Sequence, residues 1–180
     1  CAGRDDIALY TGNDDNIVPD LLTEFAVGGD PSRRVRFVGG LLGQFAVWTR
    51  RAVEIVREAR QAADAGQVPA ELLRLGAQLT DANAALFDAA NGFRGCIAGI
   101  HEALRRVGLL DGLWCLDPHE ALSRGQAEAI DRVWAAYPHL RDDAFVEANR
   151  GRWTNRFSAA LRTFRASRIT SGPVPSPGTT

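Results

Sequence analysis

The sequence predicts an α/β fold that is mostly helical, in which one strand–helix–strand unit is followed by helices only. The first observation is a pair of short β-prone segments, Ile7–Thr11 and Val35–Val38, each of which runs into glycine-containing turns. The second is that apolar residues after residue 40 recur every three or four positions, as on one face of a helix. Two strands joined through a helix, with glycines at their exits, are typical of one βαβ unit of a parallel sheet.

A helix is expected between the two strands. Proline suits the first turn of a helix, so this helix should begin near Pro19, and Gly28-Gly29 should end it. The second strand should run into Gly39-Gly40. Parallel sheets are buried on both faces, so two strands alone would leave much apolar surface open. We therefore expect this arrangement to be the end of something larger.

Helices should make up the remainder of the chain. The expected ranges are about 41–65, 69–88 and 93–107, followed by a fourth helix that carries Ile130, Val133, Trp134 and Tyr137, a short helix at 142–149 and an amphipathic helix over 153–164. The capping box Ser123-x-x-Gln126 should begin the fourth of these helices, and Pro138 should end it. The last residues, rich in proline, serine and glycine, are expected to be a disordered tail.

Composition narrows the class of protein. The 180 residues are 46% hydrophobic and 24% charged, and no apolar run approaches the roughly 20 residues that span a bilayer. Residues 1–6 lack the features of a signal peptide. The three cysteines are widely spaced, so we expect free thiols in a reducing compartment. The absence of methionine means that the chain as given does not begin at a start codon, and we expect a processed, truncated or fragmentary protein.

Charge is unevenly distributed along the chain. Residues 150–180 carry a net charge of +6 and residues 1–149 a net charge of −7. A basic segment can bind nucleic acid or a membrane surface. We favour a weakly structured, arginine-rich end instead, and expect neither a membrane nor a nucleic-acid partner.

Four segments together resemble the dihydrodipicolinate synthase / N-acetylneuraminate lyase family. An apolar strand ends in Thr-Gly-Asn-Asp, a second strand ends in Val-Gly-Gly before a long amphipathic helix, and two further segments are similar to the family's C-terminal helical hairpin. These segments are residues 7–15, 36–40, 79–87 and 99–110. The resemblance covers about Ile7 to Leu110, and it depends on the order and spacing of the four pieces.

The resemblance implies a fold and a division of the chain. The fold would be the C-terminal part of a (β/α)8 TIM barrel, with strands 7 and 8 and their helices, followed by a C-terminal helical region. The last two βα units would occupy residues 1–66 and the helical hairpin 67–110. A helical extension would occupy 111–168 and a disordered tail 169–180.

The resemblance also implies a chemistry. Enzymes of this family are carbon–carbon lyases or synthases that act on pyruvate and related 2-oxo acids through a Schiff base on a lysine. This chain contains no lysine, so no catalytic residue is expected in it, and the lysine would lie upstream of Cys1. The chain alone is therefore expected to be inactive. The full-length protein is expected to be a cytoplasmic homo-oligomer that needs no cofactor.

Part of the substrate-binding surface would remain in this chain. Active sites of these barrels lie at the carboxyl ends of the strands, where glycine lets the backbone approach a ligand. The candidate substrate-binding residues are Thr11, Gly12, Asn13, Asp14, Val38, Gly39 and Gly40. An ordinary βα turn, which needs glycine only for its conformation, explains these residues equally well.

Other motifs carry less weight. His101-Glu102 is not a zinc-protease motif because position 105 is arginine, and Gly12–Asn16 lacks the spacing of an EF-hand, so no metal site is expected. Cys96 and Cys115 are predicted to be buried rather than reactive. Two alternatives stay open: a helical interaction module without catalysis, and a nucleic-acid binder that uses residues 150–168.

Overall fold

The computed structural model describes residues 6–151. The chain divides into two compact units, Cys1–Asp143 and Ala144–Thr180. In the second unit, residues 144–151 are helical, which confirms the short helix expected there. The amphipathic helix expected over 153–164, the tail, and nearly all of the basic segment lie outside the described residues.

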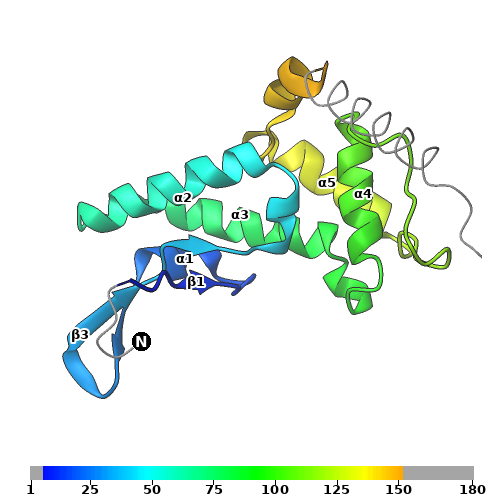
Figure 1. Ribbon diagram of the computed structural model, residues 1–180. Helices are drawn as coiled ribbons and strands as arrows, with labels where there is room; N and C mark the ends of the chain where they lie inside the picture. Colours follow the sequence, from blue (N-terminus) through cyan, green and yellow to red (C-terminus); the bar gives the residue numbers. More distant parts are fainter. Residues whose placement is uncertain (1–5, 152–180) are drawn as a thin grey trace, which may run out of the picture. The chain divides into compact units, whose positions relative to one another are not determined.

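The first unit combines two small sheets with a majority of helix (Figure 1), which confirms a mixed α/β chain that is mostly helical. Its strands are β1 (Tyr10–Thr11), β2 (Glu24–Val27), β3 (Asp30–Arg36) and β4 (Gly39–Gly40). Its helices are α1 (Ile17–Leu22), α2 (Thr49–Asp64), α3 (Ala70–Leu86), α4 (Cys96–Arg106) and α5 (Gln126–Ala136), with 3-10 turns η1 (Gly43–Ala46), η2 (Ala89–Asn91) and η3 (Pro138–Leu140).

The first predicted strand forms a parallel pair, but its partner β4 consists of Gly39 and Gly40, the residues expected to follow the second strand, and the prediction of a strand over Val35–Val38 was wrong in its bounds. Tyr10 of β1 lies opposite Gly39 of β4, and Thr11 lies opposite Gly40. The Val38 amide donates to the Leu9 carbonyl at 2.9 Å, so the pairing extends one residue towards the amino end. Parallel strands with this register direct their carboxyl ends to one edge of the sheet.

A β-hairpin replaces the second half of the helix expected from Pro19 to Gly28. Helix α1 ends at Leu22, and β2 pairs with β3 in antiparallel fashion. Gly28 and Gly29 have φ angles of 68° and 74°, which is the left-handed conformation that a two-residue hairpin turn requires. The predicted helix stop is therefore a hairpin turn, and Val35 belongs to the hairpin rather than to the parallel pair.

The helix expected over 41–65 is interrupted near its start. Residues 43–46 form η1, Trp48 has a φ of 54°, and α2 begins only at Thr49. Trp48 is 4% exposed and its ring contacts the Trp134 ring of α5 edge-on at 5.4 Å. Packing of this indole accompanies a backbone conformation that a continuous helix does not allow.

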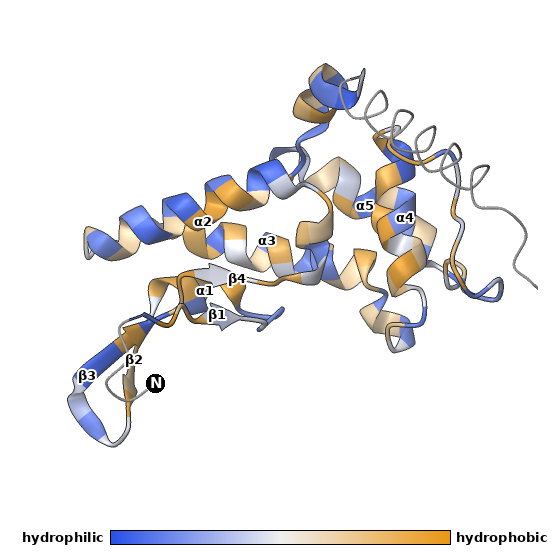
Figure 2. Cartoon of the chain, in the orientation of Figure 1, coloured by the Kyte–Doolittle hydropathy of each residue, from blue (hydrophilic) through white to orange (hydrophobic). Residues whose placement is uncertain are grey.

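The core lies where α1 meets α2 and α3, which run side by side in opposite directions (Figure 1). Ile17, Val18 and Leu21 of α1 are at most 1% exposed and belong to one apolar cluster with Ile55 of α2 and Leu79 of α3. Hydrophobic and hydrophilic residues alternate along α2 and α3 (Figure 2), as expected for helices with one buried face.

Helices α4 and α5 pack against the carboxyl end of α3. The Gln126 side-chain amide donates to the Leu86 carbonyl at 3.3 Å and to the Gly95 carbonyl at 3.0 Å. Half of the predicted capping box is present, since Gln126 Oε1 accepts from the Ser123 amide at 3.0 Å. The other half of the prediction was wrong: α5 begins at Gln126 with Gly125 as its N-cap, and the Ser123 side chain hydrogen-bonds to Asp88 instead. Within residues 6–151, no helix is long and apolar enough to cross a membrane.

Candidate functional site

The candidate site lies at the carboxyl ends of β1 and β4. The loop after β1 contains Gly12, Asn13 and Asp14, and the Leu41 amide after β4 donates to the Thr11 carbonyl at 2.9 Å. The structure thus brings together the two groups of candidate residues that are more than 20 positions apart in sequence. Gly12 and Asn13 are exposed, whereas Asp14 is half-buried.

The Thr11 hydroxyl is fully engaged within the protein. It donates to Asp20 Oδ2 of α1 at 2.6 Å and accepts from the Asn13 amide at 3.2 Å. Thr11 is 5% exposed, so its side chain points into the protein rather than towards solvent. Its role in this structure is to fix the start of the loop against α1.

The glycines of β4 have a packing role. A Cβ atom on Gly39 would overlap the Tyr10 ring, and one on Gly40 would overlap the Ile17 side chain of α1. Val38, Gly39 and Gly40 line a depression of about 340 Å³ together with Tyr10 and residues of α2. By contrast, no heavy atom lies within 4 Å of a Cβ built on Gly12. Of the candidate glycines, Gly12 is therefore the one whose surface is open.

Asn83 of α3 is the residue that sequence reasoning missed. Its side-chain Oδ1 accepts from the backbone amide of Gln44 in η1 at 3.0 Å, and its Nδ2 donates to Asp14 Oδ2 at 3.3 Å. Asn83 is 6% exposed. The available signal was an asparagine among the buried alanines and leucines of α3, but its partners lie 39 and 69 residues away in sequence.

A single face of α3 contacts the whole region. A Cβ on Gly76 would lie 3.3 Å from Val18 of α1, the Thr80 hydroxyl donates to the Asp15 carbonyl at 2.8 Å, and the Phe87 ring lies against Gly43. With Asn83 these positions follow the 3.6-residue period of a helix. Helix α3 thus supports both α1 and the two strand-end loops.

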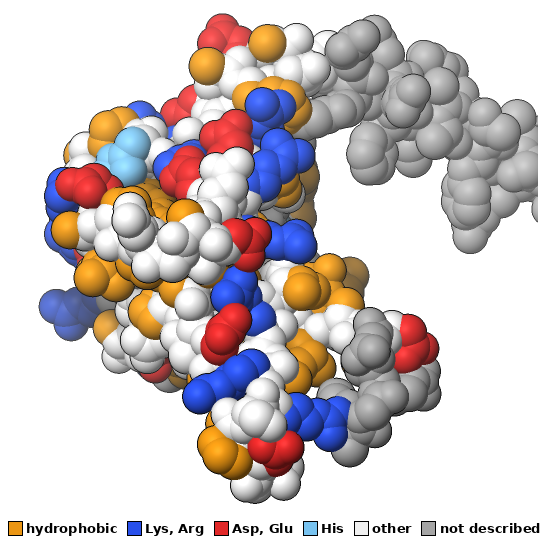
Figure 3. All heavy atoms as spheres, turned by 90° about the vertical axis from the view of Figure 1, so that its left-hand side faces the viewer, with side chains coloured by type: hydrophobic (Ala, Val, Ile, Leu, Met, Phe, Trp, Pro, Cys, Tyr) orange, Lys and Arg blue, Asp and Glu red, His pale blue; other side chains and the backbone are white. Residues whose placement is uncertain are grey.

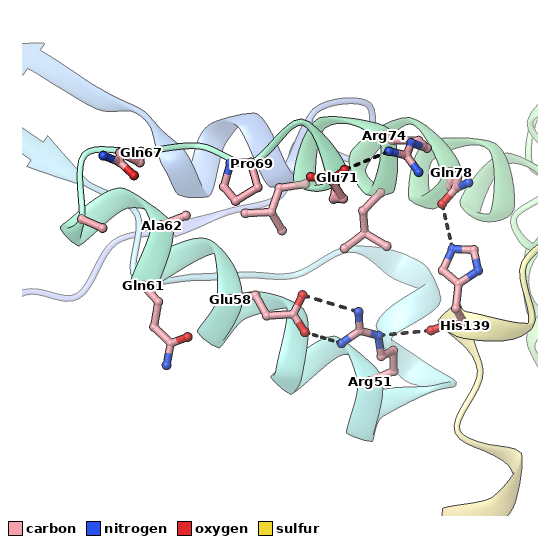
Figure 4. A pocket seen from close by; sticks show the side chains of 13 residues that line it. Arg51, Glu58, Gln61, Ala62, Gln67, Pro69, Glu71, Arg74, Gln78 and His139 are labelled. Carbon is pink, nitrogen blue, oxygen red and sulfur yellow. Dashed lines mark hydrogen bonds and ion pairs between the residues drawn. The ribbon is translucent and has the colours of Figure 1, made fainter.

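A larger groove of about 710 Å³ lies between α2 and α3 (Figure 4). Its charged rim is paired within the protein: Arg51 donates to Glu58 at 2.6 Å, and Arg74 to Glu71 at 3.2 Å. Acidic and basic side chains also surround exposed hydrophobic atoms on the face shown in Figure 3. These pairs satisfy the groove's charges internally, and we assign no ligand to it.

The thiol and imidazole groups do not form a reactive centre. Cys115 Sγ lies 3.7 Å from His101 Nδ1, but burial, followed by the charges of Glu120 and Asp117, raises the pKa of the Cys115 thiol. A raised pKa keeps the thiol protonated at neutral pH, and the thiolate is the nucleophilic form. Among residues 6–151, no group of three or more histidine, cysteine, aspartate or glutamate side chains could hold a metal ion.

No protein-family model, curated protein or solved structure matches the chain.

Proposed function

We propose that this chain provides the last two βα units and the following helices of a (β/α)8 barrel of the dihydrodipicolinate synthase / N-acetylneuraminate lyase type. The observation that carries the proposal is the parallel pairing of β1 with β4, whose loops leave at the same edge. Ligands of such barrels bind at the carboxyl ends of the strands. The exposed loop residues Gly12 and Asn13 would then form part of the surface that receives a 2-oxo acid.

In this binding surface, Gly12 and Asn13 would contact the substrate, and other residues would hold the loop in place. The open backbone at Gly12 and the Asn13 side chain offer hydrogen-bond donors of the kind that a substrate carboxylate requires. Thr11 and Asp20 would hold the loop in place without touching the substrate. The Schiff-base lysine must come from outside this sequence, since all its basic residues other than three histidines are arginines.

The direct test is to read the coding region upstream of Cys1 and to trap the encoded protein. A (β/α)8 barrel takes roughly 250 residues, and the resemblance covers this chain only as far as about Leu110. We therefore expect about 140 further residues, with a lysine at the end of the strand before β1. That lysine amine would condense with the C2 carbonyl of pyruvate and release water. Borohydride would then reduce the imine to a secondary amine, which mass spectrometry detects as a covalent adduct. A start codon directly before Cys1, or no adduct, would contradict the proposal.

The 180-residue chain allows a second measurement. In an NMR titration of the isotopically labelled chain with pyruvate, we expect the amide signals of Gly12 and Asn13 to shift. Isobutyrate, which has a carboxylate but no 2-oxo group, is the matched control. Shifts confined to α4 and α5, or equal shifts with both compounds, would argue against a 2-oxo acid surface in this loop.

The alternative is a helical interaction module without catalysis. One observation favours it: Trp114 and Leu116, in the segment between α4 and α5, are 70% and fully exposed. Exposed aromatic and aliphatic side chains are typical of protein interaction surfaces. An interaction module should unfold cooperatively as a monomer, whereas an isolated part of a barrel should associate through its strand edges. Analytical ultracentrifugation of the chain separates the two hypotheses.

A further inference from the structure

We infer that Asn83 is a positioning residue that joins the loop after β1 to the turn after β4. Its side chain hydrogen-bonds to both segments: Oδ1 accepts from the Gln44 backbone amide and Nδ2 donates to the Asp14 carboxylate. As a positioning role for a ligand-binding loop, this inference rests on the proposed function. The physical connection between the two segments can be tested without any ligand.

The chemistry of the amide explains why asparagine suits this position. One end of the side chain must accept a hydrogen bond and the other must donate one; the contact with Gln44 is buried and the contact with Asp14 is partly buried. Leucine would fill a similar space but would leave the buried Gln44 amide and the Asp14 carboxylate without this partner. Aspartate would keep the acceptor towards Gln44 and would place a second carboxylate against Asp14.

Gln44 adds a reason why the turn after β4 depends on this contact. The residue is 2% exposed, and its Oε1 has no hydrogen-bond partner within the described part of the chain. An unsatisfied buried acceptor is unfavourable. The hydrogen bond from the Gln44 amide to Asn83 therefore stabilises a turn that already contains one uncompensated polar atom.

The surrounding charges define how an aspartate at position 83 would respond to pH. Asp14 contacts the position directly, Asp15 contributes its backbone carbonyl to Thr80, Asp20 bonds to Thr11, Asp81 bonds to Arg132, and Asp88 bonds to the Gly95 amide. A pair of carboxylates in contact repels when both are ionised and shares a proton at lower pH. The charge repulsion in Asn83→Asp should therefore disappear in acid.

The test is amide hydrogen exchange of the 180-residue chain, expressed as protection factors at pH 7 and pH 4. The Asn13 and Asn16 amides report on the loop, the Gln44 backbone amide reports on the turn, and the amide of Val133, a fully buried residue within α5, reports on global unfolding. In Asn83→Asp at pH 7 we expect loop protection to fall about tenfold while Gln44 keeps its protection. At pH 4 loop protection should return to the wild-type value.

Two further variants make the result decisive. Asn83→Leu should lower protection at the loop and at Gln44 together. Thr80→Val, on the same face of α3, removes the hydroxyl's bonds to the Asp15 carbonyl of the loop and to the Gly76 carbonyl of its own helix, and it should leave the protection of Gln44 unchanged. Unchanged loop protection in Asn83→Asp, or a loss of protection at Val133 as large as that in the loop of Asn83→Asp, would overturn the inference.

Titrating the wild-type chain and Asn83→Asp with pyruvate tests the proposed function separately from this inference. If both hold, pyruvate shifts the Gly12 and Asn13 amides of the wild-type chain, and the shifts diminish in Asn83→Asp at pH 7. If the exchange results are as expected but pyruvate causes no shift in the wild-type chain, Asn83 joins the two loops and the 2-oxo acid assignment is wrong.

Discussion

Asp81 of α3 and Arg132 of α5 form a bidentate ion pair, in which the two terminal guanidinium nitrogens lie 2.7 and 2.8 Å from the two carboxylate oxygens. The Tyr137 hydroxyl donates to Asp81 Oδ2 at 2.7 Å. The hydrogen bond from Arg132, aided by that from Tyr137, lowers the pKa of Asp81. The bond to Asp81 also raises the pKa of Tyr137. One carboxylate thus connects two helices through three hydrogen bonds.

Asp81→Asn removes the ion pair and should lower the free energy of unfolding by about 1 kcal/mol at pH 7. The loss is no larger because the side chains of Asp81 and Arg132 are partly exposed to solvent. The pKa of Asp81 is lower in the folded state than its unfolded value of roughly 3.9. The stabilisation is therefore fully present above that value and is lost as pH falls through the folded pKa. Urea denaturation of the wild-type chain and of Asp81→Asn, at pH values from about 2 to about 7, measures the difference because this range brackets the unfolded pKa of roughly 3.9.

Glu71→Gln is the matched control for this pair. Glu71 and Arg74 also belong to α3, but their side chains are 74% and 64% exposed and their contact is a single one of 3.2 Å. We expect no measurable change in the free energy of unfolding. Equal effects of the two substitutions, or a loss in Asp81→Asn that persists in strong acid, would show that the bidentate geometry does not matter.

Glu102→Ala should cost about 2 kcal/mol of stability. The Glu102 side chain is 6% exposed, and it accepts from Arg105 Nε at 2.7 Å and from Arg106 Nε at 2.7 Å. The hydrogen bond from Arg105, aided by that from Arg106, lowers the pKa of this carboxyl. Removing it leaves the half-buried Arg106, which also lies over the Trp134 ring, with one partner fewer. Thermal unfolding of this variant beside Glu54→Gln, whose charge is on the exposed face of α2, tests the prediction.

The sequence was sufficient to predict the elements that local signals determine. Helix α3 follows the apolar period expected for it, and α5 ends before Pro138 because proline cannot continue a helix. The parallel arrangement of the segments around Thr11 and Gly39 was also predicted, although β4 is formed by the glycines that were expected to follow the second strand. In each case residues close in sequence carry the whole signal.

The features that were missed depend on tertiary contacts or on an ambiguous turn signal. Gly28-Gly29 fits both a helix end and a hairpin turn, and the antiparallel pairing of Phe25 with Val35 decides between them. The helix is interrupted at Trp48, whose ring packs on that of Trp134, 86 positions later. The role of Asn83 depends on partners in two distant loops. Periodicity contains no information about any of these contacts.

Gly99→Ala should be strongly destabilising, by about 2 kcal/mol or more. A Cβ at this position would overlap the Leu86 carbonyl, and it would also lie 2.6 Å from the Gln126 amide nitrogen. A backbone carbonyl cannot rotate away as a side chain can, so α4 would have to move away from α3. Gly12→Ala provides the control, because its Cβ would meet no atom within 4 Å and should leave the denaturation midpoint unchanged. Similar midpoints for the two variants would contradict the close packing of α3 and α4.

Gly28→Val isolates the backbone requirement of the hairpin. The space around this position is open, since no heavy atom lies within 4 Å of a built Cβ, so steric overlap with neighbours is excluded as a cause. The φ angle of 68° nevertheless costs a β-branched residue roughly 1–2 kcal/mol. Asparagine tolerates this conformation at the first position of a type I′ turn, so Gly28→Asn should retain wild-type stability. Urea denaturation compares the two variants. Equal midpoints would mean that the turn does not keep its left-handed conformation in solution.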